Sequence, residues 1–234
     1  MKRRSMLLGS ALAGAGVVLG GSPNVIEAAE PSLYVFLHSL LEARALSKLF
    51  EAALPGVAVW VLTKSRDFSV VRSRNPDAVV ALAPVLVANG FTPVLQGYKG
   101  GKATEPYVLL STRAVTPSSV KSVGAIDILG RREMGEFVSS LLGGNQPQVA
   151  PVTKLADLLA LLQLGQVDAI LLPARHANPL IGRTRLSLTV SHLEGKGVGL
   201  PAFYASTAEG QRMKGVFADL PFGLLKEIGV DSWR

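Results

Sequence analysis

Short apolar runs typical of buried strands alternate along this chain with segments in which apolar residues recur at helical spacing. The segment over 40–53 has an apolar residue at every third or fourth position, which is the pattern of an amphipathic helix. The first predicted strands cover 33–37, 57–62, 77–82 and 91–96, and the helices between them cover 40–53, 68–74 and 84–89. This alternation favours an α/β fold in which a largely parallel sheet has helices on both faces.

A second alternating unit begins after Thr116-Pro117. Its predicted strands cover 125–129, 148–152 and 167–173, and its helices cover 133–142 and 154–164, with Thr153 as the N-cap of the second helix. Extended runs at 106–111, 186–190 and 198–204 flank this unit, and the chain ends with predicted helices over 208–218 and 222–228. The residues that follow the N-terminal segment suffice for one large domain or two small lobes.

The N-terminal segment has the order of an export signal. Lys2-Arg3-Arg4 precedes an apolar stretch over 6–19, and the small residues Ala28-Ala29 follow it. The arginine pair followed by Ser5-Met6-Leu7-Leu8 resembles a twin-arginine (Tat) signal, and the general secretory route is the alternative. We expect a signal peptide over 1–29, cleaved after Ala28 or after Ser22, and a periplasmic or otherwise exported mature protein. An uncleaved membrane anchor is the other interpretation.

The charge and the cysteine content narrow the possible partners. The chain has 24 Lys and Arg, 17 Asp and Glu, a net charge of +7 and no cysteine. The signal holds three basic residues and one acidic residue, so the mature charge falls by two, to about +5, which suits an anionic ligand. No basic run with interleaved aromatics appears, which argues against nucleic acid. The lack of cysteine excludes disulfides, a lipid-anchored lipoprotein and thiolate metal sites.

The sequence contains no catalytic motif that we can identify. It has no Gly-x-Ser-x-Gly elbow, no His-Glu-x-x-His, no phosphate-binding P-loop and no dinucleotide fingerprint. The glycine-rich stretch over 195–199 lies between two extended runs and is predicted to be a turn. Three dispersed histidines do not suggest a zinc site. We therefore expect no metal, no cofactor and no enzymatic activity, and a periplasmic enzyme is the least favoured hypothesis.

Three segments carry a resemblance to a known family. They are the stretch 75–84, with Asn75-Pro76-Asp77 before an apolar strand and Pro84 after it; the stretch 91–107, with a glycine-rich hairpin; and the stretch 155–172, with Gly165-Gln166-Val167-Asp168-Ala169 after a helix. Their order resembles the type 2 periplasmic substrate-binding protein fold, most closely the phosphate/phosphonate-type solute receptors of ABC importers. The chain is shorter than such receptors. Their Ser/Thr-rich loop is replaced here by Gly130-Arg131-Arg132-Glu133.

The resemblance implies two lobes, each a mostly parallel sheet flanked by helices, with two crossover strands as a hinge near 109–113 and 185–190. The first lobe would hold 30–111 and 186–234, and the second would hold 112–185. The resemblance also implies a monomeric, exported receptor that closes on a small, anionic ligand and delivers it to a membrane permease. An exported sensor or accessory protein that keeps the same fold is the alternative.

Ligands of open parallel sheets bind beyond the carboxyl ends of the strands, where helix N-termini also attract anions. This rule selects as candidate ligand-binding residues His38, Ser39, Thr63, Lys64, Pro84 and Tyr98 in the first lobe, and Arg131, Arg132 and Arg175 in the second. The two adjacent arginines could pair with a carboxylate or phosphate, and the alternative is that they are solvated loop residues. Asp168 begins a strand at the far end from the cleft and is predicted to cap backbone N–H groups.

Overall fold

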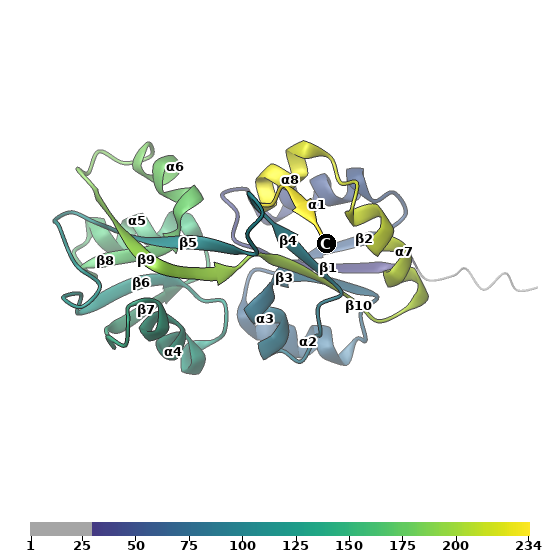
Figure 1. Ribbon diagram of the computed structural model, residues 1–234, viewed down its shortest axis with the longest axis horizontal. Coiled ribbons are helices and arrows are strands. Elements are labelled where there is room, and N and C mark those ends of the chain that lie inside the picture. Colours follow the sequence, from purple (N-terminus) through teal and green to yellow (C-terminus); the bar gives the residue numbers. More distant parts are fainter. Residues whose placement is uncertain (1–29) are drawn as a thin grey trace, which may run out of the picture.

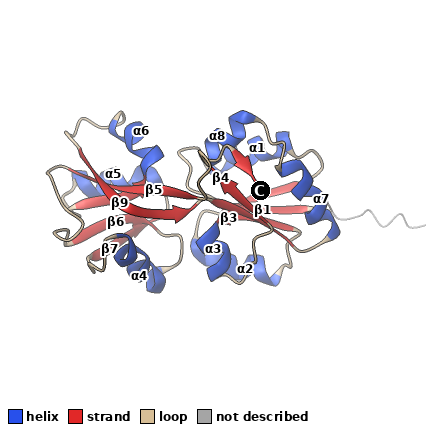
Figure 2. Cartoon of the chain, viewed as in Figure 1, coloured by secondary structure: helices blue, strands red, loops and turns tan. Residues whose placement is uncertain are grey.

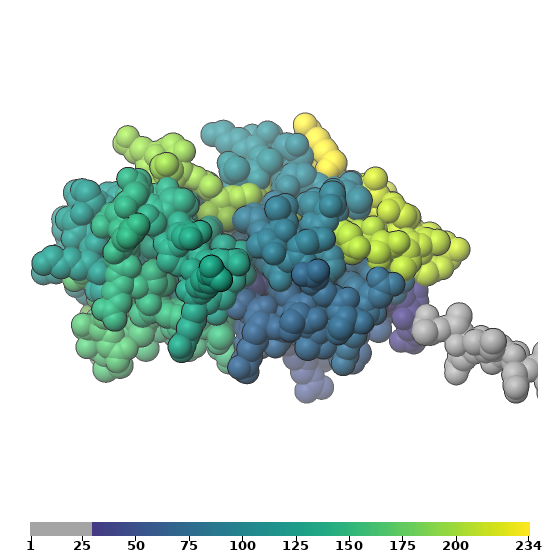
Figure 3. Space-filling view, turned by 90° about the horizontal axis from the view of Figure 1, so that it is seen from below, coloured from purple at the N-terminus to yellow at the C-terminus, as the bar shows by residue number. Residues whose placement is uncertain are grey.

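The computed structural model describes residues 30–234. The predicted signal peptide and both of its cleavage sites lie outside the described residues. The described chain forms two lobes, each built on a sheet with helices against its faces (Figure 1 and Figure 2). The space-filling view shows the green second lobe directly against the blue first lobe (Figure 3). The two-lobed α/β architecture predicted from the sequence is confirmed.

The first lobe contains a six-stranded sheet in the order β11-β4-β10-β3-β1-β2. Its strands span Ser32–Phe36 (β1), Ala58–Val61 (β2), Ala78–Leu82 (β3), Leu95–Tyr98 (β4), Pro201–Ala205 (β10) and Ser232–Trp233 (β11). Its helices span Ala43–Ala53 (α1), Phe68–Ser73 (α2), Ala83–Ala88 (α3), Ala208–Phe217 (α7) and Phe222–Ile228 (α8), with a short 3-10 turn at Ser65–Asp67 (η1).

Alternate residues of the central strand β1 pack into two hydrophobic clusters on opposite faces of this sheet. Leu33 and Val35 belong to the cluster that contains Phe50 of α1 and residues of α7 and α8. Tyr34 and Phe36 belong to the other cluster, which includes residues of α2 and α3. Because both faces of β1 are covered, its sequence is apolar from Leu33 to Phe36, as expected of an inner parallel strand.

The second lobe contains a five-stranded sheet in the order β7-β6-β8-β5-β9. Its strands span Thr104–Ser111 (β5), Ser122–Ile126 (β6), Gln148–Val152 (β7), Ala169–Pro173 (β8) and Thr189–Gly199 (β9). Its helices span Arg131–Leu141 (α4), Leu155–Gln163 (α5) and Ala177–Ile181 (α6), with a 3-10 turn at Ala174–His176 (η2). Two of five strand pairings in the first sheet and two of four in the second are parallel, so the sheets are mixed rather than mostly parallel.

The strands β5 and β9 cross between the lobes side by side (Figure 1). Both strands belong to the second sheet, because β5 pairs with β8 and with β9. The chain therefore passes from one sheet to the other before Thr104 and after Gly199. The lobe boundaries expected at 111/112 and 185/186 stay a prediction. Two backbone hydrogen bonds hold the chain together at this crossing. Leu200 N–H donates to the Ala103 carbonyl at 2.9 Å, and Ala83 N–H donates to the Leu200 carbonyl at 3.1 Å.

Three local predictions need correction. The glycine-rich stretch over 195–199, expected as a turn, is the end of strand β9. The strand expected over 91–96 is β4 at Leu95–Tyr98, because the chain turns at Asn89-Gly90 after α3 and has no regular structure over 91–93 before it pairs. Thr153 does not cap α5: Lys154 is the N-cap residue, and no side-chain hydrogen bond caps that helix. Among the described residues, no helix is long and apolar enough to cross a membrane.

Asp168 has the capping role predicted for it. Its Oδ2 accepts hydrogen bonds from the backbone N–H groups of Lys121 and Ser122, both at 3.1 Å. Although partial burial raises the pKa of Asp168, these hydrogen bonds outweigh that effect, and the pKa lies below its usual value. The carboxylate therefore fastens the start of β8 to the start of β6, at the edge of the sheet away from the first lobe.

Candidate functional site: a cleft between two helix N-termini

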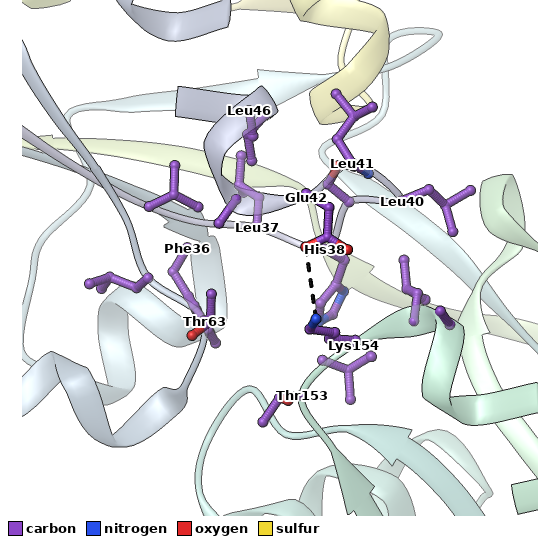
Figure 4. Close-up of a pocket in the computed structure, with 17 residues that line it drawn as sticks. Phe36, Leu37, His38, Leu40, Leu41, Glu42, Leu46, Thr63, Thr153 and Lys154 are labelled. Carbon is purple, nitrogen blue, oxygen red and sulfur yellow. Dashed lines mark hydrogen bonds and ion pairs between the residues drawn. The ribbon is translucent and has the colours of Figure 1, made fainter. Parts of the chain in front are cut away.

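A cavity of about 110 Å³ lies between the two lobes. The first lobe contributes the segment from the end of β1 into α1 and the end of β2, and the second contributes the end of β6 and the start of α5 (Figure 4). Most of the wall consists of leucine, valine, isoleucine, alanine and Phe36. The polar lining residues are His38, Ser39, Glu42, Thr63, Thr153 and Lys154.

The helices α1 and α5 both begin at this cavity, one from each lobe. Their first internal hydrogen bonds run from Ala45 N–H to the Glu42 carbonyl and from Asp157 N–H to the Lys154 carbonyl. Neither N-cap side chain bonds back to its helix. The leading N–H groups of a helix lack intrahelical partners and carry partial positive charge. Two such termini that face one cavity create a local preference for an anion.

One ion pair joins the lobes at this cavity. Lys154 Nζ lies 3.8 Å from Glu42 Oε2, so the N-cap residues of α5 and α1 meet (Figure 4). The two side chains are 59% and 80% exposed, respectively. An exposed pair of this kind contributes about 0–1 kcal/mol. The contact is therefore weak enough to break whenever the lobes separate.

His38 forms part of the inner wall of the cavity, and its imidazole points from the end of β1 toward Lys154 (Figure 4). The side chain is more than nine-tenths buried, and its Nδ1 lies 3.5 Å from the Tyr107 hydroxyl. Burial, with the charge of Arg175 second, lowers the pKa of His38 to about 3, so the ring is neutral. Burial raises the pKa of Tyr107, which therefore keeps its proton. With Tyr107 as the donor to Nδ1, the proton of His38 is on Nε2, which has no partner among the described residues.

Arg175 of η2 lies behind His38 and bonds to three elements. Its guanidinium forms a buried ion pair with Glu105 of β5. Its Nη2 donates to the His38 carbonyl at 3.3 Å, and its Nε donates to His176 Nε2 at 3.1 Å. Burial raises the pKa of Glu105, and the neighbouring Arg175 opposes that rise. Burial, with the same arginine second, lowers the pKa of His176 to about 3. Arg175 thus ties the second lobe to the end of β1 and does not reach the cavity.

Gly229 provides a test of this packing. It follows α8 with φ = 83°, and an added Cβ would collide with the Arg175 guanidinium. Gly165 follows α5 with φ = 64° and has open space in the same position. Both Gly→Ala changes cost about 1–2 kcal/mol of left-handed strain, and overpacking adds about 1–3 kcal/mol at Gly229 alone. We expect urea unfolding to show that Gly229→Ala is the more destabilising; equal losses would contradict the packing of Arg175 on Gly229.

Three of the nine residues predicted to bind a ligand line the cavity: His38, Ser39 and Thr63. Ser39 Oγ donates to Glu227 Oε1 of α8 at 2.6 Å and accepts from Leu41 N–H, so it also shapes the loop before α1. No protein hydrogen bond engages the Thr63 hydroxyl within residues 30–234. Their role in ligand binding stays a prediction.

The other six predicted residues lie outside the cavity: Lys64, Pro84, Tyr98, Arg131, Arg132 and Arg175. Lys64, Arg131 and Arg132 are exposed, and the two arginines are the first residues of α4. Tyr98 pairs with Ser232 of β11 and carries the Arg234 guanidinium 5.1 Å above its ring. Pro84 lies in the first turn of α3 beside Gly199. The guanidinium of Arg175 is paired with Glu105.

Two further polar residues of the cavity, Thr153 and Lys154, were not among the residues predicted to bind a ligand. They follow the carboxyl end of β7 and precede a helix, so the rule that selected Thr63 would have selected them as well. No sequence pattern pointed to Glu42, Glu105 or Tyr107, because their importance comes from contacts with residues that are distant in the sequence. Within residues 30–234, no group of three or more His, Asp or Glu side chains is placed to hold a metal ion.

The sequence matches no known protein family and no curated protein. Solved structures with the same fold include the periplasmic VFT2 domain of BvgS from Bordetella pertussis, with 11% identity over 85% of this chain and 92% of that chain and a TM-score of 0.56. XAC2383 from Xanthomonas citri bound to ATP gives 13% identity, 87% and 90% coverage and a TM-score of 0.57. Holo ArgBP from T. maritima gives 13%, 81% and 88%, and 0.53. At such low identity the likeness extends to the fold, and it confirms the two-lobed periplasmic binding protein architecture.

Proposed function

We propose that this protein is an exported receptor that closes its two lobes around a small ligand with a negatively charged group. The observation that carries the proposal is the cavity between the N-termini of α1 and α5, with Lys154 at its edge. A bound ligand would contact both lobes at once. Ligand binding would therefore stabilise the closed arrangement, and closure would strengthen ligand binding. The predicted export signal and the fold of the solved structures support the same function.

The first experiment is a thermal-shift screen of the mature protein with small anions, including carboxylates, phosphate and methylphosphonate. An anion present at 100 times its Kd adds about 2.7 kcal/mol of stability, which for a chain of this size raises Tm by about 5–10 °C. Lys154→Gln removes one charge-assisted contact and should weaken binding about 10- to 100-fold. Lys196→Gln, an exposed lysine on β9, is the matched control. If no anion raises Tm, or if both variants respond alike, the proposal is wrong.

From the family resemblance we also propose a partner, an ABC-type membrane permease that receives the ligand from the closed receptor. Neighbouring genes for a permease and an ATPase would support import. A neighbouring histidine kinase or a respiratory cluster would instead support a sensor or accessory protein with the same cleft.

A further inference from the structure

We propose that the cleft takes a small monocarboxylate with an apolar body, such as a branched aliphatic acid. This inference rests on the proposed function and names the chemical class of its ligand. It combines four properties of the cavity: its apolar walls, its single cation, its size and the buried N–H of His38.

The cavity walls are suited to hydrocarbon. Leu40, Leu62 and Ile126 contribute apolar side chains from both lobes, and Leu155 begins α5 with its side chain buried. Apolar surface buried against such walls supplies most of the binding free energy for a small ligand. An inorganic oxyanion has no apolar surface to place there and would leave these walls unused.

The polar groups of the cavity match one negative charge. Within residues 30–234, the cavity lining includes a single Lys or Arg, which is Lys154. Arg131 and Arg132 lie outside it, and the loop over 130–135 offers no hydroxyl groups. The free N–H groups of the two helices and the Nε2–H of His38 supply hydrogen bonds to two carboxylate oxygens. A phosphate dianion would need more donors and a second cation to offset its larger desolvation cost.

The described lining of the cavity has no buried carboxylate to pair with an α-ammonium group. Glu42 is the one carboxylate among its described lining residues, and it is mostly exposed and paired with Lys154. A buried ammonium without a hydrogen-bonded carboxylate is strongly disfavoured. The cleft therefore discriminates against amino acids, although the T. maritima protein of the same fold is an arginine-binding protein by its name.

The size of the cavity limits the apolar body. A cavity of about 110 Å³ is somewhat smaller than the apolar cavities of about 150 Å³ that hold benzene. The apolar body of the ligand should therefore have fewer than six carbon atoms.

Isothermal calorimetry with four matched probes tests this inference. Isovalerate has the proposed chemistry, valine is the same molecule with an α-ammonium group, isovaleramide lacks the charge, and acetate lacks three of the five carbons. We expect isovalerate to bind, valine and isovaleramide to bind at least tenfold more weakly, and acetate to bind about 50-fold more weakly. Lys154→Gln should weaken isovalerate binding at least tenfold, and Lys196→Gln should leave it unchanged.

The outcomes separate this inference from the proposed function. If phosphate or methylphosphonate binds in a Lys154-dependent manner and isovalerate does not, the receptor function stands and the monocarboxylate assignment is overturned. Equal binding of valine and isovalerate also overturns the assignment. If none of these anions binds, both proposals fail together.

Discussion

Replacing Arg175 with methionine is expected to destabilise the protein by about 3–5 kcal/mol, the usual cost of removing one partner from a buried ion pair. Glu105 would be left as a buried carboxylate without its cation, and the His38 carbonyl would lose a donor. Urea unfolding at pH 7.5 measures the loss. Arg113→Met is the matched control, because Arg113 also pairs with a carboxylate, Asp168, but its side chain is 74% exposed. That surface pair should contribute about 0–1 kcal/mol.

The double variant Glu105→Met/Arg175→Met distinguishes an unpaired charge from lost packing. Removing both partners leaves no uncompensated charge, so the double variant should be more stable than Arg175→Met alone. If Arg175→Met costs no more than Arg113→Met, or if the double variant loses the sum of the Glu105→Met and Arg175→Met losses, the buried pair does not stabilise the protein as described.

Acidification from pH 7.5 to pH 5 is expected to lower the free energy of unfolding through His38 and His176. The pKa of each is lowered to about 3 in the folded protein, whereas an unfolded histidine has its ordinary pKa of about 6.5. Between these values the unfolded chain binds protons that the folded protein does not. The two neutral histidines therefore contribute fully to the free energy of unfolding above pH 6.5, and this contribution is lost as the pH falls toward 3. Each histidine should account for about 2 kcal/mol by pH 5.

The measurement compares unfolding free energies at the two pH values in three variants. His176→Gln and His38→Gln should each flatten the pH dependence. His192→Gln, at the third histidine, which is exposed on β9, is the control variant. The raised pKa of Glu105 acts in the opposite direction, since a carboxyl that is protonated more readily when folded favours the folded state as the pH falls. Comparison among the histidine variants separates the two effects. The same slope in all three would contradict the buried, neutral histidines.

These two predictions concern one side of the cavity, and together they indicate how the lobes can move. The buried Arg175 guanidinium joins the lobes behind His38 by donating to the His38 carbonyl, whereas the exposed Glu42–Lys154 pair joins them at the helix N-termini. Because the second contact is exposed to solvent and weak, separation should begin there while the Arg175 cluster and the paired strands β5 and β9 stay together. Such opening is a hinge motion that admits a ligand to the N-termini of α1 and α5.

The sequence predicted the elements well where local patterning decides them. The apolar runs of β1 and β3 could be predicted because each depends on neighbours in the chain. The capping role of Asp168 followed from its place at the start of a strand, although the N–H groups that it caps lie 47 and 46 residues earlier. The sequence could not predict which sheet β5 and β9 join, because the residues of an extended run do not indicate the strand with which it pairs. The same reason explains Arg175. Its position after a strand suggested a ligand contact, but its guanidinium pairs with Glu105, which lies seventy residues earlier in the chain.

The central claim is that the lobes close on an anion between α1 and α5, and energy transfer between dyes on these helices tests it directly. The chain has no cysteine, so Lys48→Cys and Ala160→Cys, both exposed, give two unique labelling sites on the helices that begin at the cavity. We predict that isovalerate raises the transfer efficiency in a saturable manner, and that adding Lys154→Gln shifts the midpoint to at least tenfold higher concentration. Constant transfer efficiency while calorimetry records isovalerate binding would contradict the account.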